Sequence, residues 1–417
     1  MLKNIVTVLS GTVIAQLVAL AAMPLLSRLY SPEDFGHFQI FTSAINILLM
    51  VVSFRYEVAI LSVAPGTSLK MLLGLVLRLC VLTSGATWLV VWLVGSHIEE
   101  QIQGFGVIGW LIAPGMLVAG IYHALSYLPI RNLAFRLSAT TKLVQVSGYV
   151  GASIALIFTP FSSVGMVIGD IVGRFVGGLV TVGRTEHLFK ELTKPLPLTE
   201  IREAAWQFRK FPLMTFPGTL LSALTAGMVP ITFAKLYGIE VAGHYALVDR
   251  FVLVPVGVIA FAVGQVFTGG IVQALREHPQ EVYPKFKQLV LTLSVLGLLG
   301  ACTGFLTLPW GLPIILGSQW ALSGELAAWA MPMALAIFVA SPVNMVLLVS
   351  GHNVLQLIWE IVRFLIMFAG FSVVVNYQVP PTSAMAIAAM ASLLAYGIFL
   401  GMAWHVLAKR HIQPEQN

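Results

Sequence analysis

Acidic and basic residues inside long apolar segments are the residues of this sequence best placed to do chemistry. A charged side chain at the centre of a bilayer costs about 2.5–3.5 kcal/mol on insertion scales, so it is either paired or faces a water-filled cavity. Four couples of this kind occur. We take all eight residues as candidates for a substrate-binding cavity: Arg55 and Glu57, Asp170 and Arg174, Asp249 and Arg250, and Glu360 and Arg363.

Two of the couples have a helical spacing that favours pairing. Asp170 and Arg174 are four residues apart and Glu360 and Arg363 are three apart, so the members of each couple share one face of a helix. For Asp170 and Arg174 we expect a self-neutralised ion pair. The same segment carries a stripe of small residues that would pack closely against a neighbouring helix and direct the charged face elsewhere: Gly165, Gly169, Gly173 and Gly177.

The other two couples have spacings that do not favour pairing. Arg55 and Glu57 are two residues apart and do not face each other on a helix, so we expect each to meet another helix or a cavity. Asp249 and Arg250 are adjacent and point about 100° apart on a helix. One of them can therefore line a lumen while the other contacts a neighbouring helix.

The charged residues within the apolar segments carry a small net positive charge. With Arg78 included, five arginines stand against four carboxylates. Guanidinium groups suit phosphates and carboxylates, which favours an anionic substrate over a cationic drug. Cys80 and Cys302 lie in apolar runs and form no metal or disulfide pattern, so neither a bound metal nor another cofactor is expected.

The composition places the chain in a membrane. Of 417 residues, 58% are hydrophobic and 10% are charged, whereas a soluble domain carries about 25% charged residues. We therefore predict an all-α polytopic membrane protein, which excludes most soluble enzymes. The formal net charge of +6 is attributed to a basic cytoplasmic face, and no nucleic-acid partner is expected.

Apolar stretches of about 20 residues, the length needed to cross a bilayer, recur along the whole chain. They predict twelve spans: 5–27, 38–63, 71–95, 106–129, 143–160, 162–182, 212–234, 243–268, 287–309, 326–349, 355–376 and 383–407. The longest loop, 183–211, contains a stretch, 198–211, with apolar residues at helical spacing, namely Ile201, Ala205, Phe208 and Phe211. This pattern predicts a short amphipathic helix lying in the membrane interface.

The distribution of basic residues predicts the orientation. With the N-terminus in the cytoplasm, sixteen of the 23 lysines and arginines fall on the cytoplasmic side and five fall within spans. Only Arg28 and Lys235 fall at external ends. Cytoplasmic loops carry the excess of Lys and Arg, so both termini are predicted to be cytoplasmic.

An internal duplication divides the chain. Residues 28–38 and 235–245 match at Leu, Tyr, Glu, Gly and His with an offset of 207. We expect either a shared hairpin turn or a gate from the matched residues Arg28, Tyr30 and Glu33 and Lys235, Tyr237 and Glu240. The repeat predicts two six-helix halves of the same orientation, 1–182 and 212–417, joined by the cytoplasmic linker 183–211. Transporters built from parallel repeats bind substrate between the halves, so a central cavity and alternating access are expected.

Three stretches resemble a known family. Residues 26–36 (LSRLYSPEDFG), 54–60 (FRYEVAI) and 236–247 (LYGIEVAGHYAL) resemble the Wzx-type oligosaccharide flippases of bacterial polysaccharide biosynthesis. These belong to the multidrug/oligosaccharidyl-lipid/polysaccharide exporter superfamily. The resemblance covers essentially the whole chain in span number, length and central linker.

The resemblance implies a bacterial inner-membrane flippase, not an enzyme, that moves undecaprenyl-pyrophosphate-linked oligosaccharide for O-antigen, capsule or exopolysaccharide assembly. It implies alternating access coupled to a proton or sodium gradient, contact with membrane lipids, and a polysaccharide polymerase and chain-length regulator as partners. The lumen of the family is cationic or polar, and Arg55, Arg174, Arg250 and Arg363 could supply it. Our hypothesis is that Arg55 or Arg250 contacts the pyrophosphate.

Three other functions remain open at this point. A cation-coupled multidrug extruder of the same superfamily would need net acidic lumen groups. A peptidoglycan-precursor flippase usually carries more than twelve spans. A lipid-modifying membrane enzyme would need a large external loop with clustered polar residues, whereas the external loops here are short.

Overall fold

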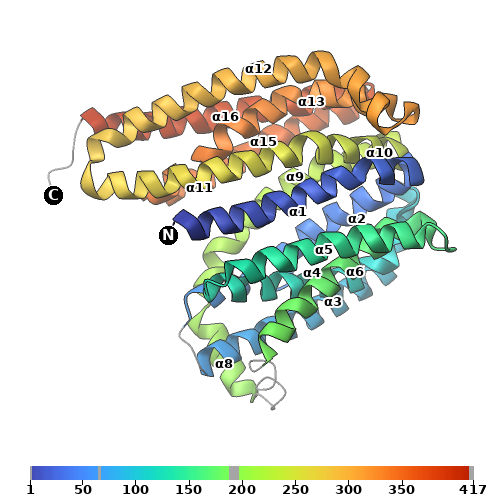
Figure 1. The fold of residues 1–417 in the computed structure, drawn as a ribbon, viewed down its shortest axis with the longest axis horizontal. Coiled ribbons are helices and arrows are strands. Elements are labelled where there is room, and N and C mark those ends of the chain that lie inside the picture. The colour runs from blue at the N-terminus through green and yellow to red at the C-terminus, as the bar shows by residue number, and fades with distance from the viewer. Residues whose placement is uncertain (1, 64–66, 187–196, 413–417) are drawn as a thin grey trace. The chain divides into compact units, whose positions relative to one another are not determined.

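The computed structural model describes residues 2–63, 67–186 and 197–412, and every regular element in these ranges is a helix. Figure 1 shows the elements in chain order. The first of them are α1 (Leu2–Leu29), α2 (Pro32–Val51), α3 (Thr67–Gln101), α4 (Phe105–Arg131), α5 (Phe135–Leu156), α6 (Gly165–Arg184), α8 (Leu198–Gln207) and α9 (Phe216–Tyr237). They are followed by α10 (Ile239–Val248), α11 (Val254–Glu277), α12 (Val282–Leu316), α13 (Ala321–Ala340), α14 (Val346–Val349), α15 (Asn353–Tyr377) and α16 (Pro381–Ile412).

Helices occupy all twelve predicted spans, which confirms the all-α polytopic class. Among the described residues, ten helical stretches are long and apolar enough to cross a membrane, and residues Val13–Leu29 form a shorter apolar helix. Helix α5 is not one of the ten. It carries Arg136 and Lys142 in its first turns and is less apolar than its neighbours.

Two predicted spans are interrupted, contrary to the continuous helices expected from hydropathy. Span 38–63 ends as an α-helix at Val51 and resumes as the 3-10 helix η1 (Tyr56–Leu61) after a break at which Phe54 and Arg55 adopt positive φ angles. Span 243–268 widens into the π-helical segment η4 (Asp249–Leu253) just before Pro255. Proline lacks an N–H and its ring clashes with the carbonyl four residues earlier, so the backbone cannot keep α-helical hydrogen bonding there.

The chain forms two compact units, residues 1–243 and 244–417. In the first unit, α1 packs on α5, α5 on α6, α3 on α4 and α2 on α9. The glycine stripe of α6 makes the α5 contact possible, as predicted, because a Cβ at Gly173 would lie 2.4 Å from the carbonyl oxygen of Gln145. Small residues allow two helix backbones to approach this closely.

The two copies of the duplicated motif contact each other inside the first unit. A Cβ at Gly36 would lie 1.9 Å from the carbonyl oxygen of Ile239, and a Cβ at Gly243 would lie 1.7 Å from that of Pro32. The start of α2 therefore crosses the start of α10 backbone to backbone. The repeated glycine is required on both sides because no side chain fits between the helices.

The second unit is built on large aromatic and aliphatic side chains. Phe286 of α12, Trp359 of α15 and Phe399 of α16 are fully buried in one cluster. The Trp359 indole N–H donates to the carbonyl of Ala395 at 3.0 Å, which satisfies its polar atom inside the core. Helix α13 packs against both α12 and α16.

The two compact units are not the predicted halves, 1–182 and 212–417, because α9 belongs to the first unit, where it packs on α2. The division into two six-helix halves stays a prediction. The predicted linker helix forms as α8, but its apolar face differs. Ile201 and Ala204 are buried against Leu75 of α3, whereas Phe208 and Phe211, expected on the same face, are only partly covered. Residues 187–196 of the linker lie outside the described residues.

Candidate functional site

The segment that breaks the second predicted span, residues 52–61, forms a turn that we call the polar corner. The hydroxyl of Thr83 on α3 donates to the carbonyl of Val52 at 3.0 Å, where α2 has just ended. The guanidinium of Arg131, at the end of α4, donates to the carbonyl of Ile60 at 2.6 Å. Backbone groups left over by the break are therefore satisfied from neighbouring helices, as a buried interruption requires.

The polar corner brings Arg55 and Glu57 together, although a continuous helix would hold them apart. The Arg55 guanidinium lies 3.3 Å from the Glu57 carboxylate, whose side chain is 1% exposed. The hydroxyl of Ser53 donates to the same carboxylate. The positive φ of Phe54 and Arg55 turns the backbone between them, which corrects the expectation that the two charges do not face each other.

Helix α4 adds an imidazole to this pair. The Nε2 atom of His123 lies 3.7 Å from a Glu57 carboxylate oxygen, and the ring packs edge-on against Tyr127 with centroids 5.4 Å apart. If His123 is protonated, it is a second cation beside Glu57. If His123 is neutral, Arg55 is the main partner of Glu57. The carboxylate therefore lies between a permanent and a titratable positive charge.

A second ion pair lies on α6, which packs against α4. The Arg174 Nε atom contacts the Asp170 carboxylate at 2.7 Å, which confirms the expected i,i+4 pair on α6. Beside it, the Tyr122 hydroxyl donates to the Gln145 side-chain carbonyl at 2.7 Å. Tyr122 packs against Gly177 of α6 and directly precedes His123 on α4, so neighbouring residues of one helix reach the two pairs.

The structure thus gathers Arg55, Glu57, Asp170 and Arg174 around α4 within the first unit. With two cations and two carboxylates the cluster is neutral apart from His123. Removing either member of a buried pair leaves a charge without compensation, which is strongly unfavourable. The cluster therefore presents guanidinium groups, which suit phosphates and carboxylates, held in place by buried carboxylates.

The second unit holds the other four candidates at two places. Arg363 binds Glu360 at 2.8 Å, stacks over the Trp359 ring at 4.9 Å and donates to the Tyr396 hydroxyl at 3.4 Å. This couple is anchored between α15 and α16. Asp249 and Arg250 lie in the π-helical segment η4, a type of irregularity that is frequent at functional sites.

The residues of the duplicated motif do not form one site. Tyr30 is 1% exposed, and its hydroxyl donates to the carbonyl of Ser153 on α5 at 2.6 Å. Tyr237 packs edge-on against Phe233 instead. The charged members, Arg28, Glu33, Lys235 and Glu240, are exposed. The gate stays a prediction, and the observed contact between the copies is made by the glycines.

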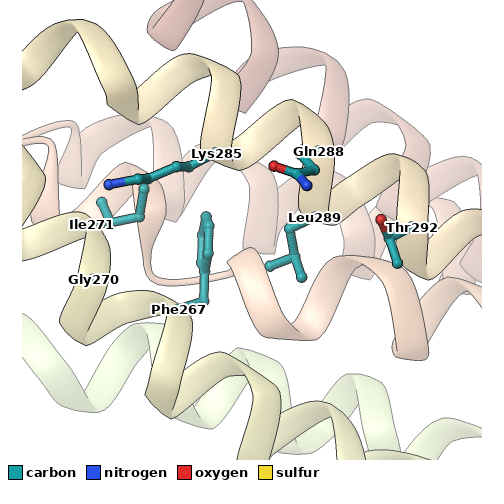
Figure 2. A pocket seen from close by; sticks show the side chains of 7 residues that line it. All are labelled: Phe267, Gly270, Ile271, Lys285, Gln288, Leu289 and Thr292. Carbon is teal, nitrogen blue, oxygen red and sulfur yellow. The ribbon is translucent and has the colours of Figure 1, made fainter.

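Two hollows open at helix ends. In the first unit, a hollow of about 760 Å3 that we call the linker pocket lies against α8 and is lined in part by Tyr56, Arg202, Trp206 and Arg209. In the second unit, a hollow of about 310 Å3 lies between α11 and α12 (Figure 2), where Phe267 stands between the helices and Lys285 lies at the rim. No group of three His, Cys, Asp or Glu residues suited to a metal occurs among the described residues.

Sequence reasoning missed Ser53, Tyr56, His123 and Tyr127, which complete the polar corner and its surroundings. His123 could have been noticed as an imidazole inside a predicted span. Tyr127 contacts His123 one turn earlier on α4, whereas the contacts of Ser53 and Tyr56 depend on the left-handed turn at Phe54 and Arg55. No glycine or asparagine marks that turn in the sequence, so no local signal points to it.

Comparisons with known proteins agree with this architecture. A family model described as "Polysaccharide biosynthesis protein" matches residues 25–324. No curated protein sequence matches the chain.

Solved transporter structures share the fold. An inward-facing multidrug resistance MATE family transporter of the MOP superfamily is 13% identical with a TM-score of 0.68, covering 96% of both chains. The lipid II flippase MurJ, inward closed, is 11% identical with a TM-score of 0.69, covering 96% of this chain and 89% of that one. A MOP superfamily transporter from Pyrococcus furiosus is 14% identical with a TM-score of 0.61, covering 97% and 96%. At these identities the likeness shows the fold, which is that of twelve-helix transporters.

Proposed function

Because this chain belongs to the polysaccharide biosynthesis protein family, shown by the match over residues 25–324, we propose that it is a flippase for lipid-linked oligosaccharides. It would move undecaprenyl-pyrophosphate-linked repeat units from the cytoplasmic to the periplasmic leaflet of a bacterial inner membrane by alternating access. The family match carries the proposal. The shared fold with a lipid II flippase supports it.

The chemistry of the charged residues suits this substrate. A pyrophosphate must cross about 30 Å of hydrocarbon, and a guanidinium lowers that cost because it binds phosphate oxygens in a bidentate manner. In our proposal Arg55 is the main contact in the first unit and Arg250 in the second. Arg55 would exchange its bond to Glu57, at 3.3 Å, for one to the pyrophosphate.

Coupling to an ion gradient fits the same cluster. If His123 takes up a proton, its imidazolium competes with Arg55 for the Glu57 carboxylate, and the guanidinium is freed to bind a phosphate. The Nε2 atom of His123 is placed for this competition, at 3.7 Å from a carboxylate oxygen of Glu57. We therefore propose proton coupling through His123, with sodium as the alternative ion.

A complementation experiment tests the proposed function. Arg55→Gln and Arg250→Gln variants are expressed in a strain lacking the gene, and surface polysaccharide and cytoplasm-facing lipid-linked oligosaccharide are measured. We expect polysaccharide to be lost and the lipid-linked intermediate to accumulate. Protein levels are measured alongside, because Arg55→Gln leaves the buried Glu57 carboxylate without its partner. Arg136→Gln is the matched control because Arg136 is exposed at the start of α5. Normal polysaccharide in both variants would disprove the roles given to these arginines.

The second candidate is a multidrug extruder, which the shared fold with a MATE transporter favours. It predicts drug sensitivity in the deletion strain with surface polysaccharide intact. Loss of polysaccharide with unchanged drug sensitivity supports the flippase instead. In either case the chain would act as a carrier in the inner membrane with both termini in the cytoplasm. A polymerase and a chain-length regulator would be the natural partners of the flippase.

A further inference from the structure

The linker pocket lies outside the cluster around α4 and combines positive charge with aromatic rings. It is a hollow of about 760 Å3 whose walls include Tyr56, Arg202, Glu203, Trp206, Arg209 and Leu213. Two guanidiniums stand against one carboxylate. The Arg209 guanidinium lies 3.7 Å from the centre of the Trp206 ring. Within the described part of the chain, neither arginine forms an ion pair.

The rim of the pocket is unusually apolar for a charged surface. Trp206 is 71% exposed, and Leu213 and Met214 at the start of the next span are 69% and 78% exposed. Large exposed apolar side chains beside arginines are the arrangement found where a helix meets lipid headgroups, with the apolar groups toward acyl chains and the guanidiniums among phosphates. This combination of groups suits a ligand with an anionic head and an apolar tail.

The floor of the pocket is held rigidly. Ile201 and Ala204 anchor α8 on Leu75 of α3, and the Tyr56 hydroxyl donates to the carbonyl of Ala205 at 3.0 Å. Figure 1 shows α8 at the end of the first unit where α3 begins. A preformed floor lowers the ordering cost of binding, so the two arginines can hold a ligand without rearrangement of the helix.

We propose that the linker pocket is a docking subsite for the phosphate-bearing headgroup of the lipid-linked saccharide before it enters the protein. Arg202 and Arg209 would hold the pyrophosphate oxygens, and the Trp206 ring would lie against the first sugar. The lipid tail would rest on Leu213 and Met214. This inference rests on the proposed function and names a binding site for its substrate.

Two observations favour the lipid-linked saccharide over an ordinary phospholipid as the occupant. The hollow of about 760 Å3 is larger than a single phosphate group needs. Tyr56 belongs both to the pocket wall and to the polar corner, where it directly follows Arg55 in the chain. The pocket therefore adjoins the segment that carries the arginine that we propose as the partner of the headgroup inside the membrane.

Direct binding to the full-length protein tests the proposal. The purified chain is reconstituted in nanodiscs of neutral phosphatidylcholine and titrated with geranylgeranyl pyrophosphate, a short polyprenyl pyrophosphate. Geranylgeraniol tests whether the pyrophosphate is needed, and phosphatidylglycerol tests the phospholipid alternative. We expect the pyrophosphate to bind at least tenfold more tightly than the alcohol and to resist displacement by phosphatidylglycerol.

The variants separate the pocket from general charge effects. The double variant Arg202→Gln with Arg209→Gln should weaken binding of the pyrophosphate at least tenfold. The double variant Arg202→Lys with Arg209→Lys keeps the positive charge and should recover part of the affinity for the pyrophosphate. This recovery would show that a protein altered at both positions is folded. Lys210→Gln is the matched control, because Lys210 is exposed beside the pocket without lining it.

Three results would overturn the inference: wild-type affinity in the double Gln variant, equal weakening by Lys210→Gln, or displacement of the pyrophosphate by phosphatidylglycerol at equal concentration. The last result would assign the pocket to a membrane phospholipid. Failure of the proposed function looks different. In that case the deletion strain makes normal polysaccharide, whatever the nanodisc measurement gives.

Discussion

A methyl group at Gly243 should force apart the two copies of the duplicated motif. The Cβ of Gly243→Ala would lie 1.7 Å from the carbonyl oxygen of Pro32 and 2.9 Å from the amide nitrogen of Gly36, whereas an ordinary contact is 3.4 Å or more. The distance from the added Cβ to the Pro32 oxygen is therefore only half of an ordinary contact distance. Both opposing atoms are backbone, so no side-chain rotation can relieve the clash and α2 and α10 must separate.

The cost of this separation sets the expected size of the effect. Overpacking a close contact typically costs about 1–3 kcal/mol, which corresponds to a shift of about 5- to 150-fold in a two-state equilibrium. If the glycine contact closes the external end, as the predicted orientation implies, Gly243→Ala should disfavour the closed state by that factor. Transport would then slow, because the transport cycle must pass through the externally closed state and this state would be less populated.

Spin labels can follow the separation directly. Labels at Arg28 and Lys235, both exposed at these helix ends, report the distance across the motif by pulsed electron resonance after Cys80 and Cys302 are replaced. We expect Gly243→Ala to move the distance distribution to longer values. Gly85→Ala is the control because a Cβ there meets nothing within 4 Å. Identical distributions and melting temperatures for Gly243→Ala and the parent protein would refute the reasoning.

Three further changes test other contacts in the first unit. Gly173→Val should destabilise the α5–α6 packing by at least about 1–3 kcal/mol, because its Cβ would lie 2.4 Å from a backbone oxygen; Gly151→Val, with open space around it, should leave the melting temperature unchanged. Tyr30→Phe leaves a buried carbonyl without its 2.6 Å hydrogen bond, and a lower melting temperature equivalent to about 1–3 kcal/mol is expected. Glu57→Gln leaves Arg55 uncompensated and should lower the free energy of unfolding by about 3–5 kcal/mol. Adding Arg55→Gln in the same chain should restore part of this loss. If the two residues did not interact, thermal melts would show that the loss in the double variant equals the sum of the losses in the two single variants.

Patterns that act over one or two helical turns were readable in the sequence. The twelve apolar stretches correspond to helices because backbone groups in lipid must be satisfied within the segment. The i,i+4 spacing of Asp170 and Arg174 was enough to predict their ion pair, which the structure shows with a separation of 2.7 Å. The spacing of four between the glycines of α6 likewise predicted a close-packed face, since helical geometry alone places them in one stripe.

The polar corner could not be read in this way. Its residues 52–61 continue an apolar run, and Phe54 and Arg55 are not residue types that favour a left-handed backbone. The break is maintained by Thr83 and Arg131, which come from α3 and α4 and satisfy the carbonyls at either side of it. Such contacts join residues about 30 and 70 positions apart, so no local pattern encodes them.

Composition and hydropathy therefore identified this chain as a helical membrane protein with few intramembrane charges, and charge spacing predicted the pair formed by Asp170 and Arg174. The partners of those charges depended on packing. Glu57 is buried between Arg55 and His123 because a turn in one helix meets a particular face of another. The repeated glycines of the two motifs likewise acquired a role only when α2 and α10 crossed. Local periodicity decides which face a residue occupies, and the geometry of helix crossings decides what that face meets.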